Sequence, residues 1–301
     1  MADLLHLVVK WSAFLFLVCS MLAVGMNLTP QAIIVPLRNA RLVVVALTLN
    51  FVVAPAFAWL LTMVIPLEPG HAAGMLLLSG AAGAPFLPRL VQSARGDSAI
   101  AIAVMALLTA GTLVFMPLAL PWMIRGFAAH PWAIARPLVL FIVLPLACGM
   151  LVKSRTAILA ARAAPAFARI GNASLLLLFV LLIADNLRDL LGVIGSGAIL
   201  AATVYVVGLF GAGWVLGGRA PEERCVLALG TAARNFAAAL VPVTSFSDPK
   251  VAIMLIVSAI VGLVVSFAAA GWVRNRMPIQ PGGVGPKADG NSAVRAQDEG
   301  H

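Results

Sequence analysis

The stretch 76–90 reads LLLSGAAGAPFLPRL, and the stretch 227–243 reads LALGTAARNFAAALVPV. Both belong to apolar segments of the length that crosses a membrane, yet each is interrupted by residues that a lipid-exposed helix normally excludes. One such stretch lies in each half of the chain, and a pair of this kind indicates the binding site of a transporter. The interrupting residues are Gly80, Gly83, Pro85, Pro88 and Arg89 in the first stretch and Gly230, Thr231, Arg234, Asn235 and Pro242 in the second.

The composition indicates a membrane protein. Hydrophobic residues make up 62% of the chain and charged residues 10%, whereas about 25% is charged in an ordinary soluble domain. The alternating pattern of a membrane β-barrel is absent, so we expect an all-α polytopic membrane protein. The net charge of +9 does not indicate a nucleic-acid partner, because the cations are spread among short loops without a binding motif. The expected partner is the lipid bilayer.

The hydropathy pattern predicts about nine transmembrane helices, and Pro and Gly mark most of the junctions between them. The third and the eighth are the broken ones. The predicted spans are 8–26, 41–64, 71–92, 98–119, 134–152, 170–187, 193–217, 223–243 and 250–272.

The broken helix is next to last in each half, which predicts an inverted repeat whose first half is one helix short. Residues 1–153 hold the four spans of the first repeat, and the second repeat begins with span five at about residue 134. Residues 154–169 are expected to be a basic cytoplasmic linker, and 170–277 hold the remainder of the second repeat. The tail 278–301 is rich in Gly, Pro, Asp, Asn and Ser, which predicts a disordered cytoplasmic end.

Most Lys and Arg residues fall on one side of these spans, which orients the chain. The loops on one side hold more Lys and Arg than the loops on the other, and cytoplasmic loops are the ones enriched in these residues. This distribution favours an N-terminus outside and a C-terminus in the cytoplasm. We therefore expect a multi-pass protein of the cell's inner (plasma) membrane.

Four short motifs carry a resemblance to a known family. They are Gly25-Met26-Asn27-Leu28, Asn50-Phe51-Val52-Val53-Ala54-Pro55 with Trp59, Ala94-Arg95-Gly96-Asp97 followed by Pro117, and Thr231-Ala232-Ala233-Arg234-Asn235. At these positions the chain resembles the bile acid:sodium symporter family, and the likeness covers all the predicted spans. The resemblance implies a secondary transporter, in which a core containing the two crossed helices moves against a panel formed by the other helices.

The residues that hold sodium in that family are replaced here. The resemblance puts the family's ligand positions on Leu87, Pro88, Ala101, Met105, Gly230 and Arg234. A hard cation prefers several oxygen ligands, and these side chains supply none. Only Asn50, at the position of a glutamine ligand, and Asn235, at that of a substrate-contacting asparagine, remain polar. We therefore expect no metal site and no cofactor; sodium stays open as a coupling ion, without its family ligands.

Arg234 is the residue that most requires an explanation. An arginine near the middle of a span costs at least about 2.5 kcal/mol on insertion scales. A carboxylate, helix C-terminal carbonyls, water or an anionic substrate would offset that cost. One hypothesis is that its guanidinium replaces sodium and fixes the crossing helices, and another is that it binds a substrate carboxylate. The predicted substrate-binding residues are Arg234, Asn235, Thr231, Asn50 and Arg89.

These observations favour a transporter or facilitator of a small organic anion. An arsenite-type efflux permease is an alternative, although neither stretch 76–90 nor 227–243 contains a cysteine for a soft metalloid. A non-transporting sensor is another alternative. An enzyme is not expected, because no paired acids, Ser–His pair or HExxH helix falls within the membrane segments. The oligomeric state, the substrate and the direction of transport stay open.

Overall fold

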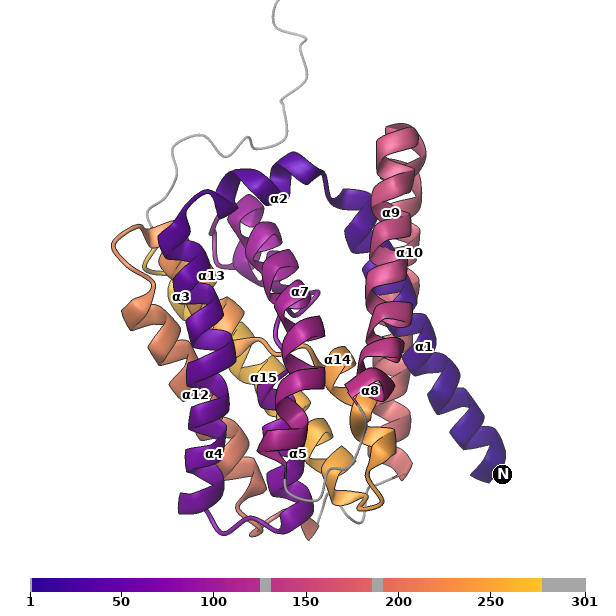
Figure 1. Ribbon diagram of the computed structural model, residues 1–301, viewed down its shortest axis with the longest axis vertical. Helices are drawn as coiled ribbons and strands as arrows, with labels where there is room; N and C mark the ends of the chain where they lie inside the picture. Colours follow the sequence, from indigo (N-terminus) through magenta and orange to yellow (C-terminus); the bar gives the residue numbers. More distant parts are fainter. Residues whose placement is uncertain (1, 125–130, 186–191, 278–301) are drawn as a thin grey trace, which may run out of the picture.

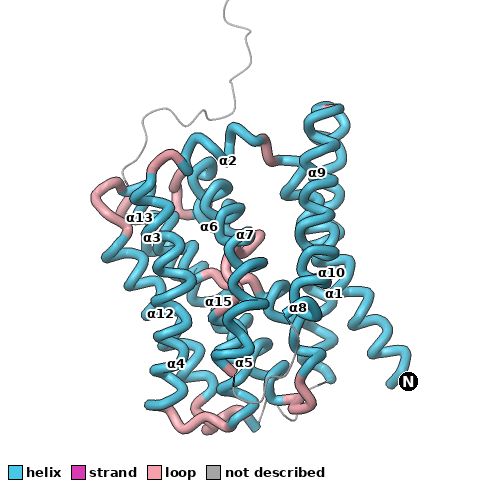
Figure 2. The backbone as a smooth tube through the Cα atoms, in the orientation of Figure 1, coloured by secondary structure: helices cyan, strands magenta, loops and turns pink. Residues whose placement is uncertain are grey.

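The fold is a bundle of helices, as predicted. The structure is a computed structural model that describes residues 2–124, 131–185 and 192–277, and it has no strand in those ranges (Figures 1 and 2). The predicted tail 278–301 lies outside the described residues. Eight of the described helices are long and apolar enough to cross a membrane. The predicted span 71–92 is present as two short helices, so the observed number agrees with about nine spans.

The α-helices occur in this order: α1 (Ala2–Asn27), α2 (Pro30–Leu37), α3 (Ala40–Thr48), α4 (Ala54–Val64), α5 (Pro69–Ser79), α6 (Leu87–Ser93), α7 (Ser98–Met123), α8 (Pro131–Leu138), α9 (Leu144–Arg155), α10 (Ala157–Asp185), α12 (Ala198–Leu216), α13 (Pro221–Ala232), α14 (Phe236–Leu240) and α15 (Lys250–Arg274). Two π-helical segments and a 3-10 turn join some of them: η1 (Leu49–Val53), η2 (Val139–Val143) and η3 (Val241–Ser245).

The structure differs from the predicted linker at 154–169. Only Thr156 separates α9 from α10, and residues from Ala157 onward belong to α10. The reason lies in the composition of this segment, because alanine and arginine are among the strongest helix formers. The basic segment is therefore the first half of a long helix.

The helices form two groups, which we call the panel and the core. The panel consists of α1, α8–η2–α9 and α10, which pack along one another. It occupies one side of the bundle, and the core, formed by α3–α7 and α12–α15, occupies the other (Figure 1). Within the panel, α1 and α9 approach each other closely at Gly25 and Gly149, where an added Cβ atom on either residue would overlap the facing backbone.

Both π-helical segments precede a proline. Pro55 follows η1 and Pro145 follows η2 at the second position of the next α-helix. Proline cannot donate a backbone hydrogen bond to the preceding turn, and a wider turn accommodates this loss. In η1 the Ala54 N–H donates to the Leu49 carbonyl, five residues earlier. The bulge thereby changes the direction of the side chains within this segment.

The two predicted broken helices are broken in the structure. Helix α5 ends at Ser79, and α6 begins only at Leu87; α13 ends at Ala232, and α14 begins at Phe236. Gly83 lies in the first break with a φ of +78°, and a Cβ atom there would lie 2.5 Å from the Thr109 backbone nitrogen. Only glycine combines this backbone conformation with such a close approach to α7.

We predict that Gly149→Ala lowers the thermal unfolding temperature of the purified protein in detergent. The added methyl group would overlap the Leu22 carbonyl and force α1 and α9 apart, at a cost of about 1–3 kcal/mol. The matched control is Gly211→Ala in α12, where nothing lies within 4 Å of an added Cβ atom. The control should keep or raise the unfolding temperature, because alanine favours helix. Equal effects of the two substitutions would contradict the close packing.

Candidate functional site

The two broken helices meet where each is interrupted. The Asn235 N–H donates to the Ala81 carbonyl over 3.0 Å, and its side-chain Nδ2 donates to the Gly83 carbonyl over 3.1 Å. Both carbonyls lie in the break between α5 and α6, where no helical donor reaches them. The predicted crossing of the two broken helices is therefore confirmed.

Arg234 lies at the centre of this crossing, with 1% of its surface exposed. Its Nη1 donates to Asn50 Oδ1 over 2.8 Å, its Nη2 donates to the Ser79 carbonyl, and its Nε is 3.4 Å from the Leu78 carbonyl. Leu78 and Ser79 end α5, and the last carbonyls of a helix lack intrahelical partners and carry partial negative charge. Of the carboxylates in the described ranges, none forms an ion pair with Arg234. The guanidinium is therefore stabilised by a helix C-terminus and one amide.

Asn50 is held in place by the π-helical segment η1. Its Nδ2 donates to the Ala46 carbonyl over 3.0 Å, and the side chain is buried. This bond leaves Oδ1 directed at Arg234. The bulge that Pro55 favours thus supplies the one side-chain acceptor of the buried guanidinium.

Two threonines of α7 hold the first break from the other side. Thr112 Oγ1 accepts from the Ala82 N–H over 2.9 Å. Thr109 Oγ1 lies 2.8 Å from the Met105 carbonyl and 3.2 Å from the Gly83 carbonyl. Neither threonine was among the predicted site residues. Their spacing along one face of an apolar helix next to a broken helix is the signal that could have identified them.

The other predicted residues lie in different places. Thr231 donates to the Leu227 carbonyl of its own helix over 2.7 Å and makes no described bond to the first break. Asn235 Oδ1 accepts from the Ala238 N–H over 3.1 Å and caps α14. Arg89 is exposed on α6, beyond the break. The structure therefore brings Arg234, Asn50 and Asn235 together and places Arg89 apart from them.

Of the positions inferred for the family's sodium ligands, Arg234 and Asn50 lie at the crossing, whereas those on α6 do not. Leu87 and Pro88 belong to α6, after the break. Gly230 faces Leu87, whose Cδ2 would lie 3.2 Å from an added Cβ atom. The side-chain oxygens that bond at the crossing and the first break belong to Asn50, Thr109 and Thr112, and Asn235 contributes its amide nitrogen as a donor.

A cavity of about 430 Å³ separates the panel from the core beside the first break. It extends from Pro85 and Phe86 in the break toward the end of the bundle at which α1 ends and α7 begins. Among the described residues that line the cavity, only Arg89 is charged. The uncharged polar side chains in its lining are Ser20, Asn27, Gln92, Ser98 and Asn172.

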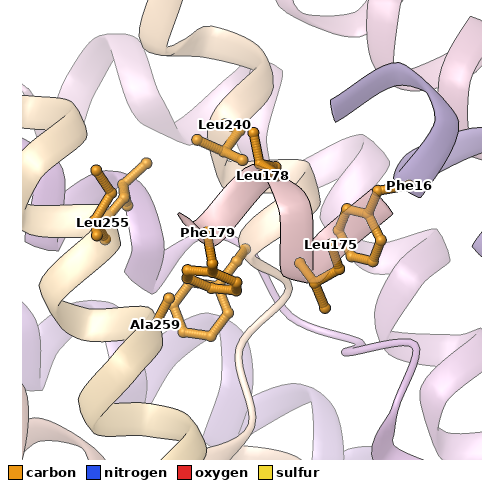
Figure 3. A pocket seen from close by; sticks show the side chains of 9 residues that line it. Phe16, Leu175, Leu178, Phe179, Leu240, Leu255 and Ala259 are labelled. Carbon is orange, nitrogen blue, oxygen red and sulfur yellow. The ribbon is translucent and has the colours of Figure 1, made fainter. Parts of the chain in front are cut away.

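A second, much smaller space of about 20 Å³ lies farther along the same interface. Its lining is wholly apolar and comes from α1, α10, α14 and α15 (Figure 3). Phe16 and Leu175 line both spaces. The interface between panel and core thus contains an open cavity with some polar side chains beside the first break, and a nearly filled, wholly apolar contact farther along.

We predict that Arg234 and Asn50 are energetically coupled. Arg234→Gln removes the guanidinium that donates to the Ser79 carbonyl and to Asn50, and Asn50→Ala removes one acceptor of a buried charge. A double-mutant cycle measured by denaturant unfolding in detergent should give a coupling of about 1–3 kcal/mol, since hydrogen bonds to charged groups are the stronger ones. Arg162→Gln on the exposed surface of α10 combined with Asn50→Ala should show none. Additive effects of Arg234→Gln and Asn50→Ala would contradict the bond.

Comparison with known proteins agrees with this architecture. A comparison with curated proteins finds no matching relative. The family model described as the Sodium Bile acid symporter family matches residues 14–192, which is more than half of the chain. The chain therefore belongs to the sodium bile acid symporter family.

Proposed function

We propose that this membrane transporter moves a small organic anion by alternating access, as a secondary transporter or facilitator, without binding sodium at the helix crossing. The observation that carries the proposal is the buried guanidinium of Arg234, which bonds to Asn50 and to the carbonyl end of α5. A positive charge is thereby built into the chain at the point where the two broken helices meet.

The chemistry of the guanidinium supports the absence of ion coupling. Arginine stays protonated in proteins and has no acceptor, so its charge is not released during a transport cycle. The donors of Arg234 point at oxygen atoms, which is the environment that a hard cation requires. Arg234 is enclosed by protein, and we therefore assign it the role of positioning the two broken helices rather than of touching the substrate.

Arg89 is the residue that we propose binds the substrate. It is the one charged side chain among the described residues of the cavity lining, and Gln92 lies one turn farther along the same helix. A guanidinium binds a carboxylate through two parallel hydrogen bonds. Asn172 adds an amide, while Phe16 and Leu175 add apolar surface. This lining suits a carboxylate on a small, partly apolar body.

The two sides of the panel–core interface support a rocking motion. The cavity and the apolar contact of Figure 3 lie at different depths of the same interface. Tilting the panel against the core would close the cavity and open the apolar contact, as in transporters built from paired repeats. With the N-terminus outside the plasma membrane, as the loop cations favour, the cavity faces the cytoplasm.

We predict that uptake is independent of sodium. Purified protein in liposomes should accumulate one or more members of a panel of radiolabelled carboxylates equally well in sodium and in potassium buffer. The physical reason is that the crossing already contains its cation. Uptake that requires sodium would contradict the proposal. Binding of a carboxylate with no flux in either buffer would indicate a non-transporting sensor.

We predict that Arg89→Gln reduces carboxylate uptake by at least about tenfold, because a charged hydrogen bond contributes about 1.5–3 kcal/mol. Arg155→Gln at the exposed end of α9 is the matched control and should transport like the parent. The two variants remove the same charge and differ only in their access to the cavity. Unchanged uptake in Arg89→Gln would remove this residue from the substrate site.

A further inference from the structure

A cluster of tryptophans and arginines lies at one end of the core, away from the cavity. The indoles of Trp214 on α12 and Trp272 on α15 meet edge to face, with ring centroids 5.0 Å apart. The Arg224 Cζ lies 5.4 Å from the Trp214 ring centroid, and the Arg276 Cζ lies 3.9 Å from that of Trp272. Two guanidiniums are thus held against a pair of adjoining indoles by cation–π contacts.

Gly218 brings a third guanidinium to this cluster. Nε and Nη2 of Arg224 donate to the Gly218 carbonyl over 2.9 and 2.6 Å. Arg41, from the start of α3, packs over the other side of the same residue, and a Cβ atom on Gly218 would lie 2.7 Å from its Nη1. Gly218 has a φ of +92°, which also favours glycine. Arg41 and Arg224 therefore meet at Gly218, and Arg276 reaches the adjoining pair of indoles from the end of α15.

Among the described residues, the positive charge of the cluster is not paired with a carboxylate. Of the carboxylates in the described part of the chain, none forms an ion pair with Arg41, Arg224 or Arg276. Glu223, in the first turn of α13, accepts a 2.7 Å hydrogen bond from Asn39. Glu223 and its neighbour Glu222 also face the positive end of their own helix. Arg41 and Arg276 are exposed and Arg224 is half-buried.

Apolar surface continues from this cluster along the same two helices. On α12, Val215 and Leu216 are 77% and 50% exposed, and on α15, Val264 and Phe267 are 64% and 51% exposed. Side chains of this kind on membrane-crossing helices contact acyl chains. A ligand that fits both features has an anionic head and apolar tails.

We propose that Arg41, Arg224 and Arg276, with Trp214 and Trp272, bind the headgroup of an anionic phospholipid whose acyl chains lie along α12 and α15. Arginine forks match the oxygens of a phosphate, and tryptophan is favoured at the level of lipid headgroups. Clustered basic residues at a membrane surface attract anionic lipid. A free phosphate ester shares the headgroup chemistry, but it would leave the adjoining apolar surface unused.

The test is lipid titration of the intact protein in detergent, followed by native mass spectrometry. The ligands are phosphatidylglycerol, phosphatidylcholine and glycerol phosphate, which is the headgroup without its chains. The parent should bind phosphatidylglycerol more tightly than phosphatidylcholine and should not retain glycerol phosphate. The double variant Arg41→Gln/Arg276→Gln should weaken phosphatidylglycerol binding by roughly 25-fold, about fivefold for each arginine.

The matched control is Arg155→Gln/Arg162→Gln, which removes the same charge from exposed positions of the panel. Its affinity for phosphatidylglycerol should stay within about twofold of the parent. If both double variants lost the same affinity for phosphatidylglycerol, the loss would be explained by net charge alone, and the proposed site would be overturned. Unchanged binding in Arg41→Gln/Arg276→Gln would also overturn it, and retention of glycerol phosphate would show a free-phosphate site. Equal unfolding temperatures of the variants and the parent establish that the fold is intact.

Discussion

The rest of the structure depends on the hydrogen bonding of one buried guanidinium. Arg234 requires oxygen acceptors in an apolar bundle, and it finds them at the carbonyl end of α5 and on Asn50. Each of those acceptors exists only because a helix is irregular: α5 stops at Ser79, and η1 turns Asn50 inward. Carbonyls freed inside a membrane are unfavourable without donors, and a buried charge is unfavourable without acceptors. The break, the bulge and the arginine therefore stabilise one another.

The contacts within the core and within the panel differ from the contacts between the two groups. The first break is hydrogen-bonded on both sides, by Asn235 from the second break and by Thr109 and Thr112 from α7. The panel is held together by the close approach of α1 to α9 and of α1 to α10. Much of the contact between panel and core is, by contrast, cavity or apolar surface. Under the proposed function, motion is therefore expected between the two groups rather than within either.

Much of this arrangement could be predicted from the sequence, because buried polar residues in apolar segments are conspicuous. The two broken helices and the need of Arg234 for acceptors follow from Gly, Pro, Arg and Asn in those segments, whereas the crossing was implied by the resemblance to the symporter family. The ligand positions inferred by counting along the chain stay a prediction; in the structure Leu87 and Pro88 lie in α6, after the break. The bonds of Thr109 and Thr112 to the first break were not predicted, because hydropathy does not show which face of an apolar helix meets the break. The cavity depends on how four helices pack, which periodicity does not reveal.

Two arginines from the broken helices thus meet different surroundings, and the difference has a physical consequence. Arg234 is enclosed and neutralised only by dipoles, whereas Arg89 faces a cavity lined otherwise by uncharged side chains. A fixed positive charge in a medium of low dielectric attracts anions and repels cations over several ångströms. Under the proposed function, an anion that enters the cavity meets Arg89 and approaches the positive crossing beyond Pro85 and Phe86. A sodium ion on the same path is repelled by both. Under the proposed function, the arginine that takes the place of the coupling ion therefore also favours a negatively charged substrate.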